Sequence, residues 1–340
     1  MNAIKFEEII SIENLLLALK QFLSDKRNRK DVQEFQLHLM DNILSLQNDL
    51  KNKTYTHGGY HAFNISDPKP RQIHKAKVRD RLLHHAIYRI LYPYFDSKFI
   101  HDSYSCRINR GTHKAINRFR DFSRKVSKNN TKTCWVLKCD IRKFFASIDH
   151  NILKEILKKH IKDENILWLL SKVIDSFSAR KVLAEHIYAM ADMCKGLPLG
   201  NLTSQLLVNV YMNEFDQFVK RELKVKYYIR YADDFVILLD RKDYLQNLLP
   251  KVASFLSESL KLSLHPNKVF IKTFASGVDF LGWIHFPKHR VLRTSTKNRM
   301  IRNLRNNPKQ ETVQSYLGLL SHGNTHKLVQ KVQDKLREII

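Results

Sequence analysis

The chain of 340 residues is poor in cysteine, glycine and proline, and it has no long apolar run. Its four cysteines (Cys106, Cys134, Cys139 and Cys194) form no Cys-x-x-Cys pair and no ligand-like spacing with histidine, which argues against a disulfide framework and a zinc site. No apolar stretch approaches the roughly 20 residues of a membrane span, and the start MNAIKFEEII lacks signal-peptide features. We therefore expect a cytoplasmic protein without a membrane partner.

Acidic side chains are also scarce, and this leaves a large positive charge. The sequence has 33 Asp and Glu against 59 Lys and Arg, a formal net charge of +26. The hydrophobic content of 43% is that of an ordinary globular protein. A polyanion is the natural partner, because each phosphate that a Lys or Arg neutralises releases counterions. Charge alone leaves a merely basic surface as the alternative to nucleic-acid binding.

The spacing of apolar residues predicts mixed helices and strands. Residues 1–50 have helical spacing, and residues 54–74 are strand-like with a turn at Asp67-Pro68-Lys69-Pro70. Residues 201–222 predict a long amphipathic helix, and the chain beyond 293 is basic and mostly helical. There is no internal repeat and no Gly/Ser linker. Further helices are predicted at 78–95, 150–176 and 243–260, and further strands at 134–139, 227–229, 235–239, 269–273 and 279–286.

Two adjacent carboxylates, Asp233 and Asp234, lie between two strongly apolar strand candidates. Burying like charges side by side is costly unless cations neutralise them. Magnesium, a hard ion that binds carboxylate and phosphate oxygens, is the natural counter-charge. Alternatively, the pair only supplies turn residues to a hairpin, as Asp often does. Taken alone, the two interpretations weigh about equally.

A third carboxylate, Asp140, ends the mostly apolar run at residues 134–139. If the two strands are neighbours, Asp140 meets Asp233 and Asp234. Three carboxylates can hold two metal ions about 3.5–4 Å apart, which activate a 3′-hydroxyl and stabilise the leaving pyrophosphate. The nearby Asp149 is predicted to cap the helix that follows it.

These residues resemble the motifs of reverse transcriptases. Tyr231-Ala232-Asp233-Asp234 matches the YxDD catalytic motif, and Asp140 with Phe145 matches the first palm motif. The resemblance continues in order over roughly residues 60–286, which makes it specific. Arg71 resembles the fingers arginine that grips the triphosphate, and residues 103–107 and 110–113 resemble a second conserved block. Lys268 resembles the lysine near the nucleotide phosphates, and Phe280-Leu281-Gly282 resembles the block that positions the primer.

The resemblance implies an α+β right-hand polymerase. Its expected parts are an N-terminal helical extension (1–50), fingers (51–130), a palm with an antiparallel sheet backed by helices (131–286) and a helical thumb (287–340). The implied activity is RNA-directed DNA polymerisation with template RNA, an RNA–DNA duplex and dNTPs as partners. Two Mg²⁺ ions, for which Mn²⁺ can substitute, are expected at Asp140, Asp233 and Asp234.

Phe145 is expected to select deoxynucleotides. In reverse transcriptases the aromatic ring at this position stacks beneath the sugar of the incoming nucleotide and leaves no room for a 2′-hydroxyl. The alternative is core packing, and we expect it of one residue in the pair Phe144-Phe145, because successive strand residues face opposite ways. The spacing from Asp140 assigns the gate to Phe145.

The segment around Leu199 indicates a subtype. Group II intron and retroviral enzymes usually have a glutamine where this chain has Leu199, and a proline where it has Gln205. The pattern, with Gly200, resembles reverse transcriptases of diversity-generating retroelements, which copy a template repeat with frequent errors at adenines. Such enzymes are generally paired with a pentameric, basic accessory variability protein, which the resemblance implies as a partner. The N-terminal helices are a candidate docking surface for it.

Primer–template contacts are expected from Tyr231 and Gly282 and from a basic thumb helix with Arg299 and Arg302 at helical spacing. The alternative for this helix is a solvated cationic face. The whole chain could also be a defence-associated, retron-type or free-standing group II intron-like reverse transcriptase. Leu199 and Gln205 argue against the intron type. A non-catalytic RNA-binding protein on a polymerase scaffold is a further alternative.

Overall fold

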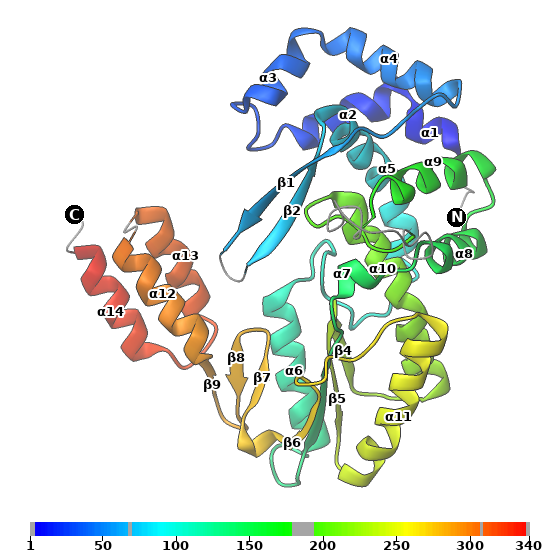
Figure 1. Cartoon of the computed structure of the whole chain (residues 1–340). Helices are drawn as coiled ribbons and strands as arrows, with labels where there is room; N and C mark the ends of the chain where they lie inside the picture. The colour runs from blue at the N-terminus through cyan, green and yellow to red at the C-terminus, as the bar shows by residue number, and fades with distance from the viewer. Residues whose placement is uncertain (1–3, 67–69, 179–193, 307–308, 338–340) are drawn as a thin grey trace, which may run out of the picture. The chain divides into compact units, whose positions relative to one another are not determined.

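The computed structural model describes residues 4–66, 70–178, 194–306 and 309–337 (Figure 1). Contacts between Cα atoms divide the chain into two compact units. Unit 1 comprises residues 1–101, 141–218 and 254–263, and unit 2 comprises residues 102–140, 219–253 and 264–340. Both contain helices and strands, and every strand pair of the three sheets is antiparallel. The predicted α+β fold class is therefore confirmed.

Helices dominate unit 1, as predicted for residues 1–50. Several apolar residues of the N-terminal helices, among them Leu15, Ile43 and Leu46, are fully buried. The helix predicted at 78–95 is confirmed and makes its most extensive contacts with α2 (Ile12–Phe22) and α10 (Leu202–Gln217). The bounds are α1 (Phe6–Ile10), α2 (Ile12–Phe22), α3 (Lys30–Leu37), α4 (Leu39–Lys51), α5 (Val78–Asp96), α7 (Phe144–Ser147), α8 (His150–His160), α9 (Glu164–Asp175) and α10 (Leu202–Gln217).

Two helices of unit 1 begin at aspartate caps. The Asp149 side chain accepts hydrogen bonds from the backbone N–H groups of residues 151 and 152, which confirms its predicted role. Asp163 caps α9 in the same way, so the helix predicted at 150–176 is two helices. The helix predicted at 201–222 is confirmed, but the prediction that it is amphipathic was wrong. Helix α10 is buried on most sides and continues as a π-helical turn, Phe218–Glu222.

A two-stranded hairpin follows the N-terminal helices. Strands β1 (Tyr60–Ile65) and β2 (Arg71–Ala76) pair with Ile65 opposite Arg71, so the strand-like region predicted from the sequence is confirmed. Residues 67–69 of the predicted turn lie outside the described residues.

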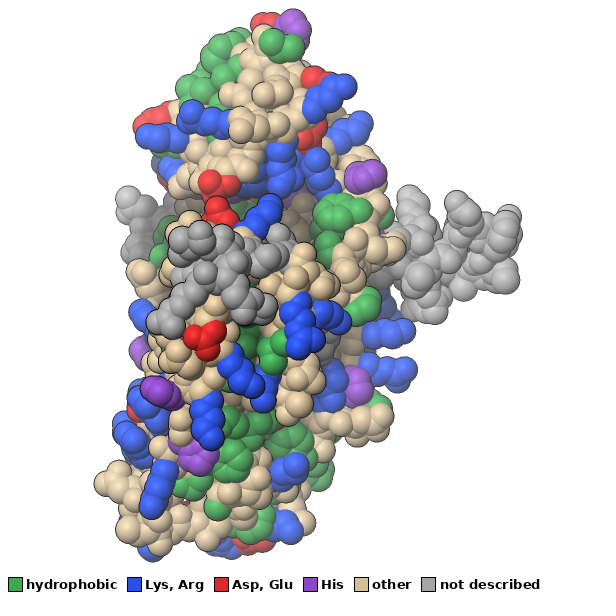
Figure 2. Space-filling model, turned by 90° about the vertical axis from the view of Figure 1, so that its left-hand side faces the viewer, with side chains coloured by type: hydrophobic (Ala, Val, Ile, Leu, Met, Phe, Trp, Pro, Cys, Tyr) green, Lys and Arg blue, Asp and Glu red, His purple; other side chains and the backbone are tan. Residues whose placement is uncertain are grey.

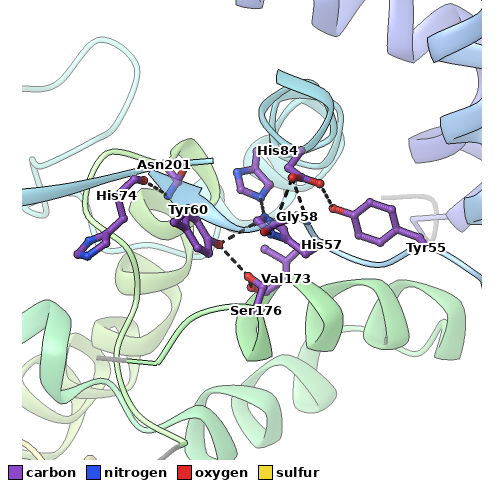
Figure 3. Close-up of polar contacts among 10 residues, drawn as sticks. Tyr55, His57, Gly58, Tyr60, His74, His84, Val173, Ser176 and Asn201 are labelled. Atoms are coloured by element: carbon purple, nitrogen blue, oxygen red, sulfur yellow. Dashed lines mark hydrogen bonds and ion pairs between the residues drawn. The ribbon is translucent and has the colours of Figure 1, made fainter. Parts of the chain in front are cut away.

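A buried polar network holds the start of this hairpin against α5 (Figure 3). The Tyr55 hydroxyl donates to Asp80 Oδ1 at 2.7 Å, and the N–H of Gly58 donates to Asp80 Oδ2 at 3.1 Å. Nε2 of His57 lies 3.2 Å from Nε2 of His84 on the same helix. Because Asp80 is only 2% exposed, these bonds satisfy a carboxylate that would otherwise be costly to bury.

Buried histidines make the fold sensitive to acid. Burial lowers the pKa of His84 well below its usual value, and burial lowers the pKa of His285 to about 3. Both groups bind protons more readily in the unfolded chain, so their stabilising contribution is complete above pH 6.5 and falls as the pH drops. We expect roughly 1.4 kcal/mol of lost stability per pH unit for each histidine. Thermal unfolding between pH 7.5 and 5 measures this loss.

The matched controls are His84→Gln and, at the exposed His61, His61→Gln. The first should flatten the pH dependence, whereas the second should leave it unchanged. A melting temperature that is constant down to pH 5 would contradict the prediction.

Unit 2 is built on a four-stranded antiparallel sheet in the order β4-β5-β3-β6. Its strands are β3 (Trp135–Asp140), β4 (Tyr228–Tyr231), β5 (Asp234–Leu239) and β6 (Phe270–Thr273). Helix α6 (Thr112–Val126) packs against β4 and β5, and its Ile116 and Phe119 share one buried core with Ile229 and Val236. Helix α11 (Lys242–Ser259) begins in unit 2 and ends in unit 1.

A second sheet and three helices complete unit 2. Strands β7 (Val278–Phe280) and β8 (Trp283–His285) are joined by a tight turn in which Leu281 and Gly282 both have positive φ, at 51° and 87°. The predicted palm boundary at residue 286 falls between β8 and β9 (Arg290–Leu292), which pair in the same sheet. The predicted helical end of the chain is confirmed: α12 (Thr294–Asn306), α13 (Gln310–Leu320) and α14 (His326–Arg337) follow.

Two of the four free cysteines, Cys134 and Cys139, are buried in and beside β3, and burial raises their pKa to about 12. They are therefore packing residues. Over the described stretches, the chain has no helix that is both long and apolar enough to cross a membrane.

Candidate active site

The four-stranded sheet of unit 2 sets two of the predicted carboxylates directly opposite each other. Strands β3 and β5 are antiparallel, and their register pairs Asp140 with Asp234. Directly opposite residues of an antiparallel pair point to the same face, with Cβ atoms about 4.5–5.5 Å apart. Asp233 lies in the adjoining turn, between β4 and β5. The strand end and the hairpin bend therefore bring the acidic residues to one edge of unit 2.

The turn of this hairpin has an unusual backbone. Tyr231 pairs with Asp234, so Ala232 and Asp233 form a two-residue turn. Ala232 has a φ of 55°, a left-handed conformation that costs an alanine about 1 kcal/mol or more. A positive φ at the first turn residue suits the twist of a tight hairpin.

Arg230 supports this strained turn from inside the protein. Its side chain is completely buried; Nη1 donates to the Ala232 carbonyl at 3.2 Å, and Nη2 donates to Ser103 Oγ at 3.1 Å. The Arg230 backbone also pairs with the segment before α6: its N–H donates to Asp102 O, and its carbonyl accepts from Tyr104 N. The block that resembles the second conserved motif of reverse transcriptases thus supports the hairpin that carries Asp233 and Asp234.

Asp234 has the strongest electrostatic perturbation of the site. Burial raises its pKa to about 7, the nearby Asp140 and Asp233 act in the same direction, and Lys138 opposes them. The Lys138 Nζ lies 3.3 Å from Asp234 Oδ2. The other oxygen, Oδ1, is buried and has no hydrogen-bond partner among the described residues. A carboxylate held in this way gains from an additional cation.

Asp140 is paired with a second lysine. Nζ of Lys268 donates to both carboxylate oxygens of Asp140, at 3.1 and 3.2 Å. The same loop is tied to the strand end by a bond of 2.7 Å from His265 N to the Asp140 carbonyl. Lys268, which the sequence assigns to nucleotide phosphates, thus contacts a carboxylate in this structure.

The site's fit to a metal rests on its donor atoms. Within the described ranges, no three His, Cys, Asp or Glu side chains are gathered closely enough to hold an ion. The amines of Lys138 and Lys268 occupy part of the surroundings of Asp234 and Asp140. Still, the unpartnered oxygen of Asp234 and the adjacent carboxylates are hard oxygen donors of the kind that Mg²⁺ and Mn²⁺ bind. The donor set therefore fits such an ion.

The residues predicted to contact primer and template also lie in unit 2. The Tyr231 hydroxyl accepts a hydrogen bond of 3.1 Å from Thr112 Oγ1 at the start of α6. Gly282 occupies the left-handed turn before β8, where a side chain would be strained. Arg299 and Arg302 lie on α12, half-buried and exposed respectively, while Met300 of the same helix is in the core.

Five predicted nucleotide-binding residues belong to unit 1, and the segment 197–201 links three of them to their neighbours. The Leu197 N–H donates to the Phe145 carbonyl at 2.8 Å, and the Leu199 carbonyl accepts from His74 N in β2 at 3.1 Å. Asn201 donates from Nδ2 to the His74 carbonyl (Figure 3). Gly200 has a φ of 103°, and a Cβ there would lie 2.9 Å from Ile73 Cγ2. The segment therefore lies along β2.

The remaining two of these residues are on regular elements. Arg71 is the exposed first residue of β2, and Gln205 is half-buried in the first turns of α10.

Phe144 is 3% exposed whereas Phe145 is half-buried, so one ring packs in the core and the other is accessible. The premise that both lie in a strand was wrong, because they begin the short helix α7.

The sequence interpretation missed Lys138 and Arg230. Both interrupt buried strands, in the runs Trp-Val-Leu-Lys-Cys-Asp and Tyr-Ile-Arg-Tyr. Lys138 is 8% exposed and Arg230 is 0% exposed. Charged residues are buried to this extent only when they are paired. A charged residue within an apolar strand next to a catalytic motif was the signal that could have identified them.

The surface around these units is strongly basic. Figure 2 shows many Lys and Arg side chains on the face it presents and few acidic ones, in line with the net charge of +26. An antiparallel sheet with paired carboxylates at its edge, within a basic protein, agrees with the class of right-hand polymerase folds.

Comparison with known proteins identifies the family within that class. Residues 65–285 match the family Reverse transcriptase (RNA-dependent DNA polymerase), and the chain belongs to this family. Membership agrees with the predicted right-hand polymerase class.

Individual relatives share only a modest sequence identity with this chain. YkfC of Escherichia coli (strain K12) is 27% identical over 266 residues, which are 68% of this chain and 66% of YkfC. LtrA, a group II intron-encoded protein of Lactococcus lactis subsp. cremoris, is 23% identical over 77% of this chain and 49% of its own length. The chain thus spans at most about two thirds of these relatives. The structure of apo telomerase from Candida tropicalis, truncated from its C-terminal domain, is 14% identical over 75% of this chain and 60% of that chain, with a TM-score of 0.48.

Proposed function

We propose that this protein is an RNA-directed DNA polymerase that copies a template RNA into cDNA by two-metal nucleotidyl transfer. The observation that carries the proposal is the pairing of Asp140 with the half-buried Asp234, whose buried Oδ1 has no partner in the described chain. Extension of a DNA primer on an RNA template, with Mg²⁺ and all four dNTPs, tests it. A protein that binds the primer–template but never extends it would instead be a non-catalytic RNA-binding protein.

The carboxylates have the metal-binding role in this proposal. Asp140, Asp233 and Asp234 hold two Mg²⁺ ions, and Mn²⁺ can substitute. Bound at this site, the ions activate the primer 3′-hydroxyl and stabilise the charge on the leaving pyrophosphate. Lys138 keeps one oxygen of Asp234 oriented, as their distance of 3.3 Å supports. Arg230 keeps the turn rigid, so the carboxylates are positioned before substrate binds.

The nucleotide is held by groups of opposite charge. Arg71, exposed on β2, binds the triphosphate. Lys268 would hold a nucleotide phosphate, and its side chain, 42% exposed, is accessible for that role. Phe145 selects the deoxyribose, and Leu199, Gly200 and Gln205 line the position of the nascent base pair. Tyr231, Gly282, Arg299 and Arg302 contact the primer–template duplex.

We further propose that the enzyme is of the diversity-generating subtype and misincorporates opposite template adenines. The support is the side chain at Leu199, which lacks the hydrogen-bonding groups of glutamine, on a segment fixed to β2. We expect Leu199→Gln to lower adenine misincorporation about fivefold, because one hydrogen bond contributes on the order of 1 kcal/mol of discrimination. Sequencing of cDNA from a defined template measures the error at each base.

Leu199→Met serves as the matched control, because it changes the shape of the side chain without adding an amide. It should leave the error spectrum as it is. Equal adenine error in wild type and Leu199→Gln would remove the proposed role of Leu199.

A group II intron-type reverse transcriptase is the second candidate. The similarity to LtrA favours it. The DNA beside the gene separates the two, since a diversity-generating element carries a template repeat next to a variable-repeat gene.

We also propose a pentameric, basic accessory variability protein as a partner. Its support is a group of exposed apolar residues in and between α2, α3 and α4, namely Leu16, Leu17, Leu37, Met40 and Leu44. Co-purification of a neighbouring gene product with the wild type, but not with a Leu37→Lys and Met40→Lys variant, tests this surface.

A further inference from the structure

Unit 2 contains a basic pocket that none of the roles above uses. It has a volume of about 430 Å³ and lies between α6, the turn from β8 to β9 and the loop from α13 to α14. The basic side chains that line it are Arg120, His285, Lys288, His289, Arg290 and His322, and none of its described lining residues is acidic. Such a pocket favours an anion.

Arg290 is held rigidly at the wall of the pocket. It is only 9% exposed; Nη2 donates to Asn117 Oδ1 at 2.9 Å, and Nε donates to the His322 carbonyl. The guanidinium also lies over the Trp283 ring, 5.7 Å from its centroid. Its Nη1 is buried and has no hydrogen-bond partner in the part of the chain that the structure describes. Two N–H donors of a fixed cation are thus left for a ligand.

Repulsion among the positively charged side chains also favours the binding of an anion in this pocket. Burial lowers the pKa of Arg290, and the neighbouring Arg120 lowers it further. For His285 the same two arginines act with burial to keep the ring neutral. With no carboxylate in the lining, a bound anion would relieve both the burial of charge and the repulsion.

The pocket is separate from the acidic edge of the sheet. Phe274, part of its lining, donates from its N–H to the carbonyl of Cys134, just before β3 begins. Asp140 is at the other end of the same strand, about 17 Å away for six residues of extended chain. The pocket therefore cannot hold the phosphates of a nucleotide that reacts at Asp140.

We propose that this pocket binds a backbone phosphate of the RNA–DNA duplex, and the assignment rests on the proposed polymerase function. A duplex is long enough to reach both ends of β3, and a phosphate oxygen matches the free N–H donors of Arg290. Lys288 and Arg120, which are exposed at the pocket, add a salt-sensitive attraction. The same chemistry would suit a free phosphate or pyrophosphate ion, so the test separates these sources.

The test measures affinity for a template–primer duplex over a range of salt concentrations, together with primer extension. The pocket variant is Arg120→Gln with Lys288→Gln, which changes two exposed side chains. The matched control is Arg124→Gln with Lys125→Gln, which removes the same charge from exposed positions of α6 outside the pocket. We expect the slope of log affinity against log salt to fall by about 1 to 2 in the pocket variant, and by clearly less in the control.

A second measurement locates the phosphate. Neutral methylphosphonate groups are placed one at a time along the duplex. One position should weaken binding to the wild type at least threefold, yet not weaken binding to Arg290→Gln, which has no charge at this position. The melting temperature of each variant reports whether it folds. Equal slopes for pocket and control variants, or no such position, overturn the proposal.

A third arm titrates inorganic phosphate and pyrophosphate against the wild type. These ions could raise the melting temperature of the wild type but not that of the pocket variant, while the two proteins bind the duplex with equal affinity. In that case the pocket is a free-anion site and the proposal is overturned. If the wild type neither binds nor extends the primer–template, the proposed function fails first. If the wild type binds and extends the primer–template and the pocket variants do so equally well, only the proposed role of the pocket is refuted.

Discussion

Asp234→Asn should reduce Mg²⁺-dependent primer extension at least about 10³-fold, the largest effect expected of any single substitution in this chain. Asparagine keeps the size of the side chain but removes the charge that a divalent ion needs. Because Oδ1 of Asp234 is buried, water has little access to replace the lost ligand there. Asp233→Asn should have a comparable effect. Steady-state extension rates at saturating dNTP and Mg²⁺ concentrations measure both.

The fold of the Asp234→Asn variant needs its own control, because Lys138 loses its charged partner. Unfolding in urea and affinity for the primer–template separate a catalytic loss from a loss of structure. Asp149→Asn is the matched substitution: asparagine also caps helices, and the cap lies in unit 1. It should extend primers almost as fast as the wild type. A folded Asp234→Asn protein that retains a tenth of the activity would refute the metal-binding role of Asp234.

Phe145→Val should increase incorporation of ribonucleotides relative to deoxynucleotides on the order of 100-fold. The smaller side chain leaves space for a 2′-hydroxyl, while contacts to the base and phosphates remain. The half-exposure of Phe145 supports an accessible ring, and the bond of 2.8 Å from Leu197 N to its carbonyl fixes the backbone. The ratio of kcat/KM for each rNTP and its dNTP is the relevant measurement, since a general loss of activity cancels in it.

Phe144→Val is the natural comparison, because the neighbouring ring is buried and packs in the core. It should cost about 1–3 kcal/mol of stability and leave sugar selectivity unchanged. If Phe144→Val relaxed selectivity and Phe145→Val did not, the gate would be assigned to the wrong ring.

The sequence predicted elements well where the signal was local. The apolar runs on either side of Asp233 and Asp234 indicated the hairpin, and Asp149 indicated a helix start. Local pattern could not distinguish a strand from a short helix at Phe144 and Phe145, since apolar runs suit both.

Long-range contacts were beyond the reach of sequence pattern. The support of the turn at Ala232 and Asp233 by Arg230 depends on Ser103, which is 127 residues away along the chain. The basic pocket joins Arg120, Arg290 and His322, which no spacing rule connects. The α+β class followed from alternating apolar segments, whereas the register that sets Asp140 opposite Asp234 required the folded sheet.

The two lysines beside the acidic edge have a consequence for the resting protein. Lys138 and Lys268 serve Asp234 and Asp140 as built-in counterions, so the fold need not wait for magnesium to neutralise its most crowded negative charges. Folding and activation are thereby uncoupled. Under the proposed function, magnesium would be required for synthesis but not for folding, so protein made without the ion would still be folded.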